Sequence, residues 1–314
     1  MGLAIAGGVV LLGSLAMGSV AVPVADLVQA LWGQGDELTH TILWELRLPR
    51  TLLAALVGAA LGLSGALVQG LLRNGLADPY LLGISAGAGL VAVVFLGFGL
   101  AFTWLPLAAW VGALATATLV FGLARSATGL SVTRLILAGV AVGSFFGSVT
   151  SMLLLFADDR VQLALNWLAG SLNGRSWREV QAVSGYIGLG LILGCGLGRP
   201  LNLLSLGEEM ARSLGVAIGR TRLTIGAIAA LLAASAASTV GLIGFVGLLV
   251  PHVTRLLVGT DYRWVLPVSA AMGAILLVAA DTAARSGPVE LPVGVVTALV
   301  GAPFFGWLLW RRTP

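Results

Sequence analysis

Long apolar runs recur along this chain of 314 residues and constrain its fold more than any other feature. A helix needs about 20 mostly apolar residues to cross a hydrocarbon layer about 30 Å thick. Within that layer every backbone N–H and C=O must be bonded inside the protein, which helices achieve segment by segment. The sequence therefore predicts an all-α integral membrane protein with about ten transmembrane helices. The predicted spans are 2–22, 50–72, 79–98, 103–124, 132–156, 181–198, 223–241, 242–258, 264–284 and 292–310.

Composition agrees with this interpretation. Hydrophobic residues make up 58% of the chain and charged residues only 10%, whereas a soluble domain carries about 25% charged residues. So few charges cannot cover a surface that faces water. We expect residues 1–314 to form a single polytopic domain. The run Gly2–Val22 lacks the basic segment of a signal peptide, so we interpret it as the first span.

The reactive residue types exclude several classes of function. All 17 basic residues are arginines, which rules out a P-loop lysine and Schiff-base chemistry. The single Cys195 cannot form an intrachain disulfide, and His40 and His252 are not spaced as metal ligands. No paired carboxylates or nucleophile constellation is present either. We therefore predict no catalytic residues, no bound metal and no cofactor.

The arginines also predict the orientation in the membrane. With ten alternating spans, 11 arginines fall on the side of the N-terminus and six on the opposite side. Loops that remain in the cytoplasm carry the excess of basic residues. Both termini and the loop 200–222 are therefore expected on the cytoplasmic side, and Pro23–Pro49 on the outer side.

The run Thr224–Val258 is too long for a single straight span. Gly241, Gly244, Gly247 and Pro251 indicate a break within it. Two interpretations stay open, namely one tilted helix with a re-entrant piece, or two spans.

Glycine is abundant, with 44 residues in the chain. Small residues allow helices to approach closely in lipid. Gly58 and Gly62 have the GxxxG spacing of such contacts, although so many glycines also produce this spacing by chance.

The predicted inner loop contains a short amphipathic helix at about 206–214. Ser205 and Glu208 fit the S-x-x-E capping box, and Gly215 fits the position after a helix end. Apolar side chains recur every four residues on one face: Leu206, Met210 and Leu214. Such a helix either rests on the lipid headgroups or docks into a groove on a soluble partner.

Three arginines are predicted near the outer ends of spans. Arg47 and Arg50 precede the second span, with Pro49 between them, and Arg285 follows the ninth. They either anchor the helices at the interface or capture carboxylates of a partner, for which the guanidinium fork is suited. Asp281, near the outer end of the ninth span, is interpreted as a structural charge.

The loop after the second span has the residues of a tight turn. Asn74 and Gly75 favour the turn. Asp78 can cap the next helix, with Pro79 at its first position. Physical chemistry alone assigns this loop no further role.

Taken together, these motifs resemble a known family. The segment RLPRTLLAALVGAALGLSGALVQGLLRNGLADPYLLGISAGAGL resembles the signature of FecCD/BtuC-type permeases, the membrane subunits of type II ABC importers for iron chelates, haem and cobalamin. The resemblance continues through LILAGVAV, NWLAGSL, GEEMARSLGV, GLIGFVGLLVPHVTR and ELPVGVVTALVGAPFFGWLLWR. It extends from about Glu45 to Arg311.

The resemblance implies a BtuC-like importer permease without catalysis of its own, in the bacterial cytoplasmic membrane. It further implies a homodimer with a path along the dimer interface, two ATPase subunits below and an extracytoplasmic binding protein above. The implied docking residues are Arg47, Arg50 and Arg285, and the implied gate residues are Asn74, Leu76 and Thr133. The implied ATPase-coupling residues are Leu206, Glu208, Glu209, Met210, Ala211, Arg212, Leu214 and Gly215.

One position departs from the family pattern, because Gly75 stands where the motif N-P-L-A-D-P has its first proline. Glycine loosens a turn that proline would fix.

The expected cargo is an iron chelate, either a ferric siderophore or haem, with cobalamin as the alternative. The spans offer no histidine or methionine cluster for a bare metal ion. A secondary transporter is the rival class, but no chain of protonatable residues runs through the spans.

Overall fold

The computed structural model of the chain describes residues 2–17, 23–32, 36–126, 129–156 and 160–312. Nearly all of these residues are helical, as predicted. The α-helices are α1 (Gly2–Ala16), α2 (Val24–Leu31), α3 (Glu37–Thr41), α4 (Leu48–Leu72), α5 (Ile84–Gly97), α6 (Leu105–Leu123), α7 (Val132–Leu154), α8 (Val161–Leu168), α9 (Trp177–Cys195), α10 (Gly198–Ser205), α11 (Glu208–Ser213), α12 (Ile218–Val240), α13 (Val246–Val258), α14 (Tyr262–Ala284) and α15 (Val293–Arg312). The short elements are the π-helical η1 (Ile42–Arg47), the 3-10 turns η2 (Pro79–Leu82) and η3 (Phe102–Trp104), and the paired strands β1 (Arg125–Ser126) and β2 (Gly129–Leu130).

Ten helical segments correspond to the ten predicted spans. Within the described ranges, five continuous segments are long and apolar enough to cross a membrane, and a sixth is reached if the pair α9 and α10, bent by 46°, counts as one span. Four shorter apolar helices lie within α1, α5, α13 and α15. Residues 18–22 of the first predicted span lie outside the described residues. Helices α2 and α8 were not predicted, because eight residues are too few to give a span-length apolar run.

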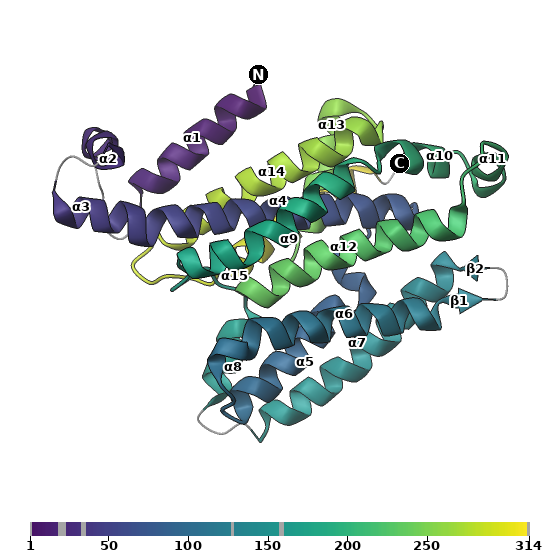
Figure 1. Cartoon of the computed structure of the whole chain (residues 1–314), viewed down its shortest axis with the longest axis horizontal. Coiled ribbons are helices and arrows are strands. Elements are labelled where there is room, and N and C mark those ends of the chain that lie inside the picture. Colours follow the sequence, from purple (N-terminus) through teal and green to yellow (C-terminus); the bar gives the residue numbers. More distant parts are fainter. Residues whose placement is uncertain (1, 18–22, 33–35, 127–128, 157–159, 313–314) are drawn as a thin grey trace.

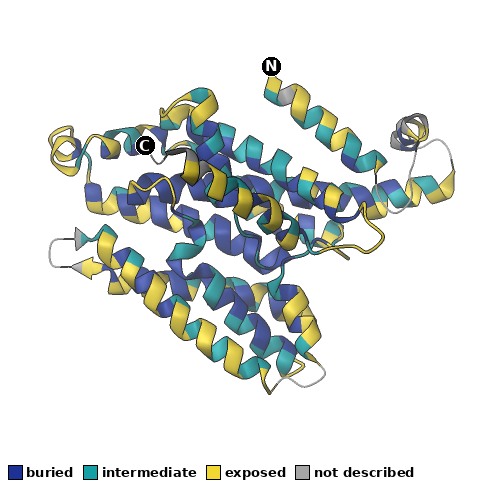
Figure 2. Cartoon of the chain, turned by 180° about the vertical axis from the view of Figure 1, so that it is seen from behind, coloured by how far each residue is buried: buried dark blue, intermediate teal, exposed yellow. Residues whose placement is uncertain are grey.

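Helix α4 runs through the middle of the bundle (Figure 1). It packs on α9, α12, α13 and α14, while α5, α6 and α7 pack on one another as a second group. Helix α12 contacts both α4 and α6 and so joins the two groups. The buried residues gather along these middle helices, and exposed residues cover the outer ones (Figure 2).

Glycines set how closely α4 approaches its neighbours. A Cβ added at Gly58 would overlap the carbonyl oxygen of Gly273 on α14, and one at Gly65 would overlap that of Gly247 on α13. A Cβ at Gly62 would likewise overlap the carbonyl oxygen of Ser269. The spacing of Gly58 and Gly62 therefore marks a true helix contact, with backbone packed against backbone.

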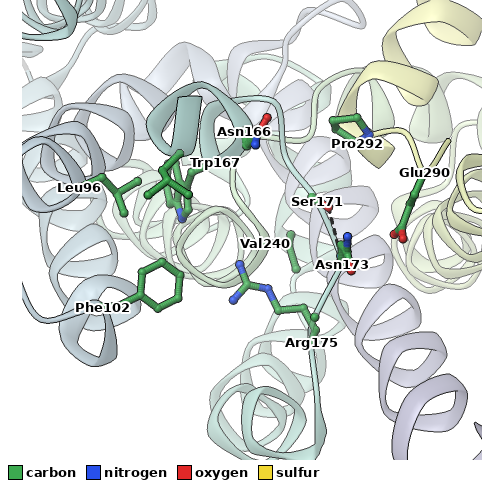
Figure 3. A pocket seen from close by; sticks show the side chains of 12 residues that line it. Leu96, Phe102, Asn166, Trp167, Ser171, Asn173, Arg175, Val240, Glu290 and Pro292 are labelled. Carbon is green, nitrogen blue, oxygen red and sulfur yellow. Dashed lines mark hydrogen bonds between the residues drawn. The ribbon is translucent and has the colours of Figure 1, made fainter. Parts of the chain in front are cut away.

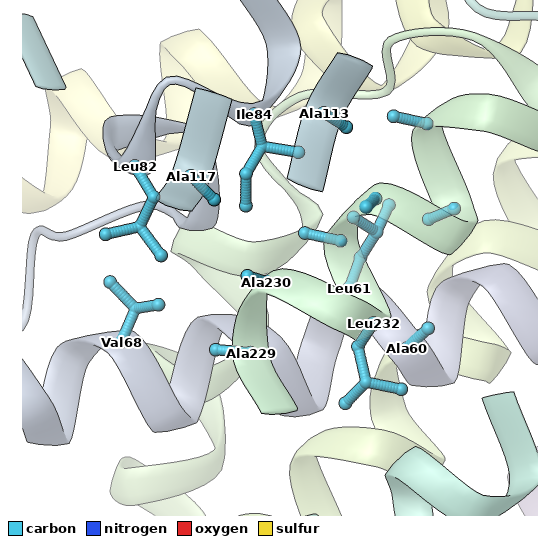
Figure 4. Packing of buried hydrophobic residues seen from close by; sticks show 14 of the residues in the cluster. Ala60, Leu61, Val68, Leu82, Ile84, Ala113, Ala117, Ala229, Ala230 and Leu232 are labelled. Carbon is cyan, nitrogen blue, oxygen red and sulfur yellow. The ribbon is translucent and has the colours of Figure 1, made fainter. Parts of the chain in front are cut away.

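Small side chains continue this packing between α4 and α12. Ala60 of α4 lies beside Leu232 of α12 in Figure 4, and both residues are buried. Further along α4, the Ser64 hydroxyl donates to Ala229 O at 2.7 Å. Alanine has no rotamer freedom to lose, so such contacts order the bundle at a small entropic cost.

The predicted break lies at residues 241–245, between α12 and α13. Gly241 and Phe245 have positive φ angles of 79° and 67°. Helix α13 has only 13 residues and returns toward the C-terminal end of α4, where Arg255 donates a hydrogen bond to Gln69 Oε1. The chain therefore crosses twice, and the second crossing is partly non-helical. Its backbone finds partners in the protein, for example Ile243 N–H with the Tyr80 hydroxyl at 3.3 Å.

Candidate functional sites at the two ends of the bundle

Five arginines that the sequence predicts on opposite sides of the membrane lie at opposite ends of the bundle. Arg47, Arg50 and Arg285 line one cavity of about 470 Å³. Arg73 and Arg255 line another, of about 210 Å³, at the far end of α4. The first end is called the outer end below, and the second the inner end.

At the outer end, two of the predicted docking arginines hold the end of α1. Arg47 Nη1 donates to the carbonyl oxygens of Leu15 at 2.5 Å and Ala16 at 3.1 Å. Arg285 Nη2 donates to the carbonyl and hydroxyl oxygens of Ser14, both at 2.6 Å. The last carbonyls of a helix lack partners within it, so both arginines cap α1. Their side chains are almost fully buried.

Arg50 makes the central ion pair of this end. It forms a two-pronged contact with Asp281, with Nη2 2.7 Å from Oδ1 and Nε 3.0 Å from Oδ2. Arg285 Nε lies 3.5 Å from the same carboxylate. Asp281 is only 1% exposed, so its charge requires these partners. The carboxylate on the ninth span is structural, as the sequence indicated.

Glu290 is a second partner of Arg50, and no sequence pattern indicated this role. Its carboxylate lies 2.7 Å from Arg50 Nη2, and its side chain is 32% exposed. Of the two carboxylates on Arg50, it is the one within reach of solvent. A composition count cannot find such a residue, because the pairing depends on how the loop before α15 folds back over α4.

At the inner end, the loop 200–222 contains two helices where one was predicted. The prediction of a capping box at Ser205 and Glu208 is wrong. Ser205 is the last residue of α10, and its hydroxyl donates a hydrogen bond to Asn202 O. Gly207, with φ of 118°, is the residue before α11. The predicted helix end at Gly215 is confirmed, with φ of 83°. A capping box is formed instead by Ser176 and Glu179, at the start of α9.

The predicted apolar face is exposed. Leu206, Met210 and Leu214 are 62%, 54% and 54% exposed, whereas Ala211 is buried toward the bundle. Leu206 lies before α11 and Leu214 directly after it, so the face spans the helix and both of its flanks. Nothing among the described residues covers this face.

Glu208 fixes α11 to the rest of the bundle. Its Oε1 accepts a hydrogen bond from Arg222 Nη2 at 2.6 Å, and Arg222 Nη1 donates to Leu130 O at 3.0 Å. This hydrogen bond holds the pKa of Glu208 below its ordinary value, so the carboxylate stays ionised near neutral pH. Arg222 thus connects α11, α12 and the β1–β2 hairpin.

The predicted gate residues lie at the same inner end, in the loop after α4 and at the start of α7. Asn74 Oδ1 accepts the N–H of Leu76 at 3.0 Å, and both residues are exposed, as is Thr133. Asp78 caps η2 by accepting the N–H of Tyr80 at 2.8 Å, as predicted. Burial raises the pKa of Asp78 to about 6.

Gln69 positions the loop after α4, and this role was not predicted from the sequence. Its buried amide donates to Ala77 O at 3.1 Å and to the carbonyls of Gly247 at 3.3 Å and Leu248 at 3.1 Å. Arg255 donates to its oxygen. One side chain therefore ties α4, the loop after α4 and α13 together. The available signal was a lone amide within the apolar run GALVQGLL.

A polytopic helical bundle with an uncovered apolar helix face at its arginine-rich end is typical of the membrane subunit of a transporter. The chain matches the FecCD transport family over residues 6–311 and belongs to that family. It is therefore the permease subunit of an ABC-type importer, in line with the resemblance found in the sequence.

Individual relatives agree with this assignment. The chain is 44% identical to the cobalamin import system permease BtuC of Halobacterium salinarum over 88% of its own length and 75% of that protein. It is 41% identical to the hemin transport permease HmuU of Yersinia pestis over 96% and 94% of the two chains. Among solved structures, one described as an inward-facing ABC transporter of the metal-chelate type matches with a TM-score of 0.89 and 31% identity, covering 99% and 98%. The predicted importer-permease fold is confirmed.

Replacing Gln69 with leucine should loosen the loop after α4. Three backbone carbonyls and Arg255 would lose a buried partner, and one unmet buried group costs about 1–3 kcal/mol. We expect a lower melting temperature in detergent and faster amide exchange at residues 74–78. Gln181→Leu, at an exposed position on α9, is the matched control. Equal exchange in the two variants would contradict the positioning role.

Proposed function

We propose that this chain is the permease subunit of an ATP-driven importer that carries an iron chelate into the cytoplasm as a single polytopic domain. The observation that carries the proposal is the exposed apolar face at Leu206, Met210 and Leu214, in a chain of the FecCD family. A membrane subunit without a P-loop needs a separate ATPase, and this face offers a surface for it. The coupling residues are those predicted from the sequence, with Glu208 acting through Arg222.

Charged residues on that face should uncouple the ATPase. Met210→Glu and Leu214→Glu would place carboxylates in an apolar groove of the partner, and an unpaired buried charge is strongly unfavourable. We expect the affinity for the ATPase to fall about tenfold or more, with a matching loss of transport. Ser213→Glu, on an exposed polar position of α11, should leave binding unchanged. Wild-type affinity in the double variant would exclude this docking face.

The proposed orientation places the inner end and both termini in the cytoplasm of a bacterial cell. The support is the separation of the arginines, 11 toward the inner side and six toward the outer. In a Cys195→Ser background, Ser205→Cys should resist an impermeant thiol reagent in intact cells, and Asn173→Cys should react. Both positions are exposed, at opposite ends of the bundle. Labelling with the reverse pattern would invert the topology.

The outer arginines Arg47, Arg50 and Arg285 are proposed to receive acidic residues of an extracytoplasmic binding protein. Arg47 and Arg285 are already bonded to α1, so Arg50 is the member best able to accept a new carboxylate. In the docked complex, a carboxylate of the binding protein would replace Glu290 as the ion-pair partner of Arg50.

This exchange predicts opposite effects for two substitutions. Glu290→Gln should speed association with the binding protein, because Arg50 loses a competing charge, and Arg50→Gln should slow it. Both effects should shrink at high salt, as they do for charges at an interface rim. Arg134→Gln, exposed at the inner end, is the control. If the association rate changes neither with salt nor with either substitution, the docking role is excluded and these arginines are only structural.

A second copy of the chain is the proposed partner along α7. This helix is the least buried of the long spans, with only 17% of its apolar window buried. Gly143 and Gly147 have open space above them. The hydroxyls of Ser148 and Ser151 bond to the carbonyls of their own helix, so the face carries no unmet donor there. Small residues of this kind favour close helix contact in lipid.

The cargo is proposed to be a ferric siderophore or haem, with cobalamin as the alternative. The support is that HmuU is named for hemin and the solved relative for metal chelates, while BtuC is named for cobalamin. The test is ATP-dependent uptake by the complete complex in proteoliposomes, with ferric siderophore, haem and cobalamin offered in parallel. Accumulation of an iron chelate is expected. Uptake of cobalamin alone would overturn the cargo and leave the importer standing.

A further inference from the structure

A second hollow at the outer end is not explained by the arginine cluster around Asp281. It has a volume of about 450 Å³ and is lined by α5, η3, α8, α12 and two loops. Leu96, Phe102 and Trp167 form an apolar wall, and the Arg175 guanidinium points into the space (Figure 3). This hollow is called the outer vestibule below.

Arg175 is half-buried, and no carboxylate among the described residues forms an ion pair with it. Its Nε atom is buried and has no hydrogen-bond partner. Among the residues that the structure describes, the guanidinium takes part in none of the ion pairs within 4 Å. Burial lowers the pKa of Arg175, and the charge of Glu179 opposes this shift. An arginine nevertheless stays charged at any physiological pH.

The carboxylates near Arg175 are committed to other groups. Glu179 accepts hydrogen bonds from the N–H and hydroxyl of Ser176, both at 2.8 Å. Glu290 lines the vestibule but pairs with Arg50 at 2.7 Å. The remaining polar groups of the wall include the amides of Asn166 and Asn173, which can donate. Because Arg50 balances the charge of Glu290, the rest of the vestibule offers an anion one cation and neutral donors.

We propose that the outer vestibule binds a carboxylate group of the transported chelate, with Arg175 as its direct contact. This inference rests on the proposed function and narrows its cargo to chelates with a free carboxylate. The guanidinium fork matches a carboxylate with two parallel hydrogen bonds. The volume is that of a small-molecule site, and aromatic walls suit the apolar part of such a ligand.

The place of the vestibule favours cargo over a side chain of a docked protein. It adjoins a wider apolar groove of about 590 Å³ on α15. The same three segments line both hollows, with Trp167, Val240 and Pro292 on one side and Leu168, Leu242 and Gly294 on the other. The two hollows thus share a dividing wall, and a molecule in the vestibule lies directly beside the groove on α15.

Backbone contacts fix the boundary between the two hollows. Ser171 N–H donates to Val240 O at 2.8 Å, and Gly294 N–H donates to Gly170 O at 3.1 Å. A Cβ at Gly294 would overlap the carbonyl of Ala169, and one at Gly241 that of Trp167. These contacts are called the glycine seam below. They hold the walls of the vestibule in place.

The test is equilibrium binding of radiolabelled ferric citrate, which has free carboxylates, and of a ferric trihydroxamate without any. Both are offered to the purified permease with its ATPase in nanodiscs. Arg175→Gln should weaken ferric citrate binding about tenfold, as expected for loss of a charged hydrogen-bond pair. Arg175→Lys should recover part of the loss. Arg178→Gln, an exposed arginine three residues further on, should match the wild type, and the trihydroxamate should respond to no substitution.

Equal binding of ferric citrate by the wild type and Arg175→Gln would overturn the proposal, as would no binding of it by the wild type. Weaker docking of the binding protein to Arg175→Gln, with chelate binding unchanged, would also overturn it and assign the carboxylate to that partner. ATP-dependent uptake by the complete complex is measured in parallel in proteoliposomes. A complex that binds ferric citrate through Arg175 but accumulates no chelate with ATP would overturn the proposed function and leave this site standing.

Discussion

The contact of α4 with α14 and α13 through bare backbone is the constraint on which the other features depend. Apolar helices gain little from association in lipid by the hydrophobic effect, so packing and small residues must hold them. Gly58, Gly62 and Gly65 let two neighbours reach the backbone of α4. The helix has 25 residues and is thus about 37 Å long. It holds Arg50 at one end and Gln69 at the other, so its packing positions both candidate sites.

Several buried polar groups at the two ends follow one rule, which is that each finds a partner from a distant element. Asp281 lies between Arg50 and Arg285, and the amide of Gln69 reaches three carbonyls on two elements. Breaking such a contact leaves a buried polar group without a hydrogen-bond partner, which is unfavourable. These residues therefore restrict the relative positions of the helices. Arg175 departs from this rule at the outer end, and this departure makes the vestibule a candidate binding site.

Periodicity and composition predicted the ten apolar segments, the break near Gly241 and the caps at Asp78 and Gly215. Each of these depends on a local property of the chain. The roles of Glu290 and Gln69 could not be predicted in this way, because their partners are far away in sequence. Ser205 shows the opposite failure. The pattern S-x-x-E was present, but α10 extends through Ser205, and a hydroxyl inside a helix end bonds to its own turn rather than to the next helix. The family resemblance predicted a docking role for Arg47, Arg50 and Arg285 without revealing that two of them cap α1.

Helix α12 gives the two candidate sites a mechanical connection. Near its start, Arg222 bonds to Glu208 on α11. At its end, Val240 O accepts from Ser171 within the glycine seam beneath the outer vestibule. Between these points its 23 residues form an uninterrupted helix, which transmits displacement better than a loop would. A movement of α11 that keeps the pair of Glu208 and Arg222 intact would pull on the start of α12. Because the chain after Gly241 is non-helical, the seam is where such a movement can change the walls of the vestibule without bending α12.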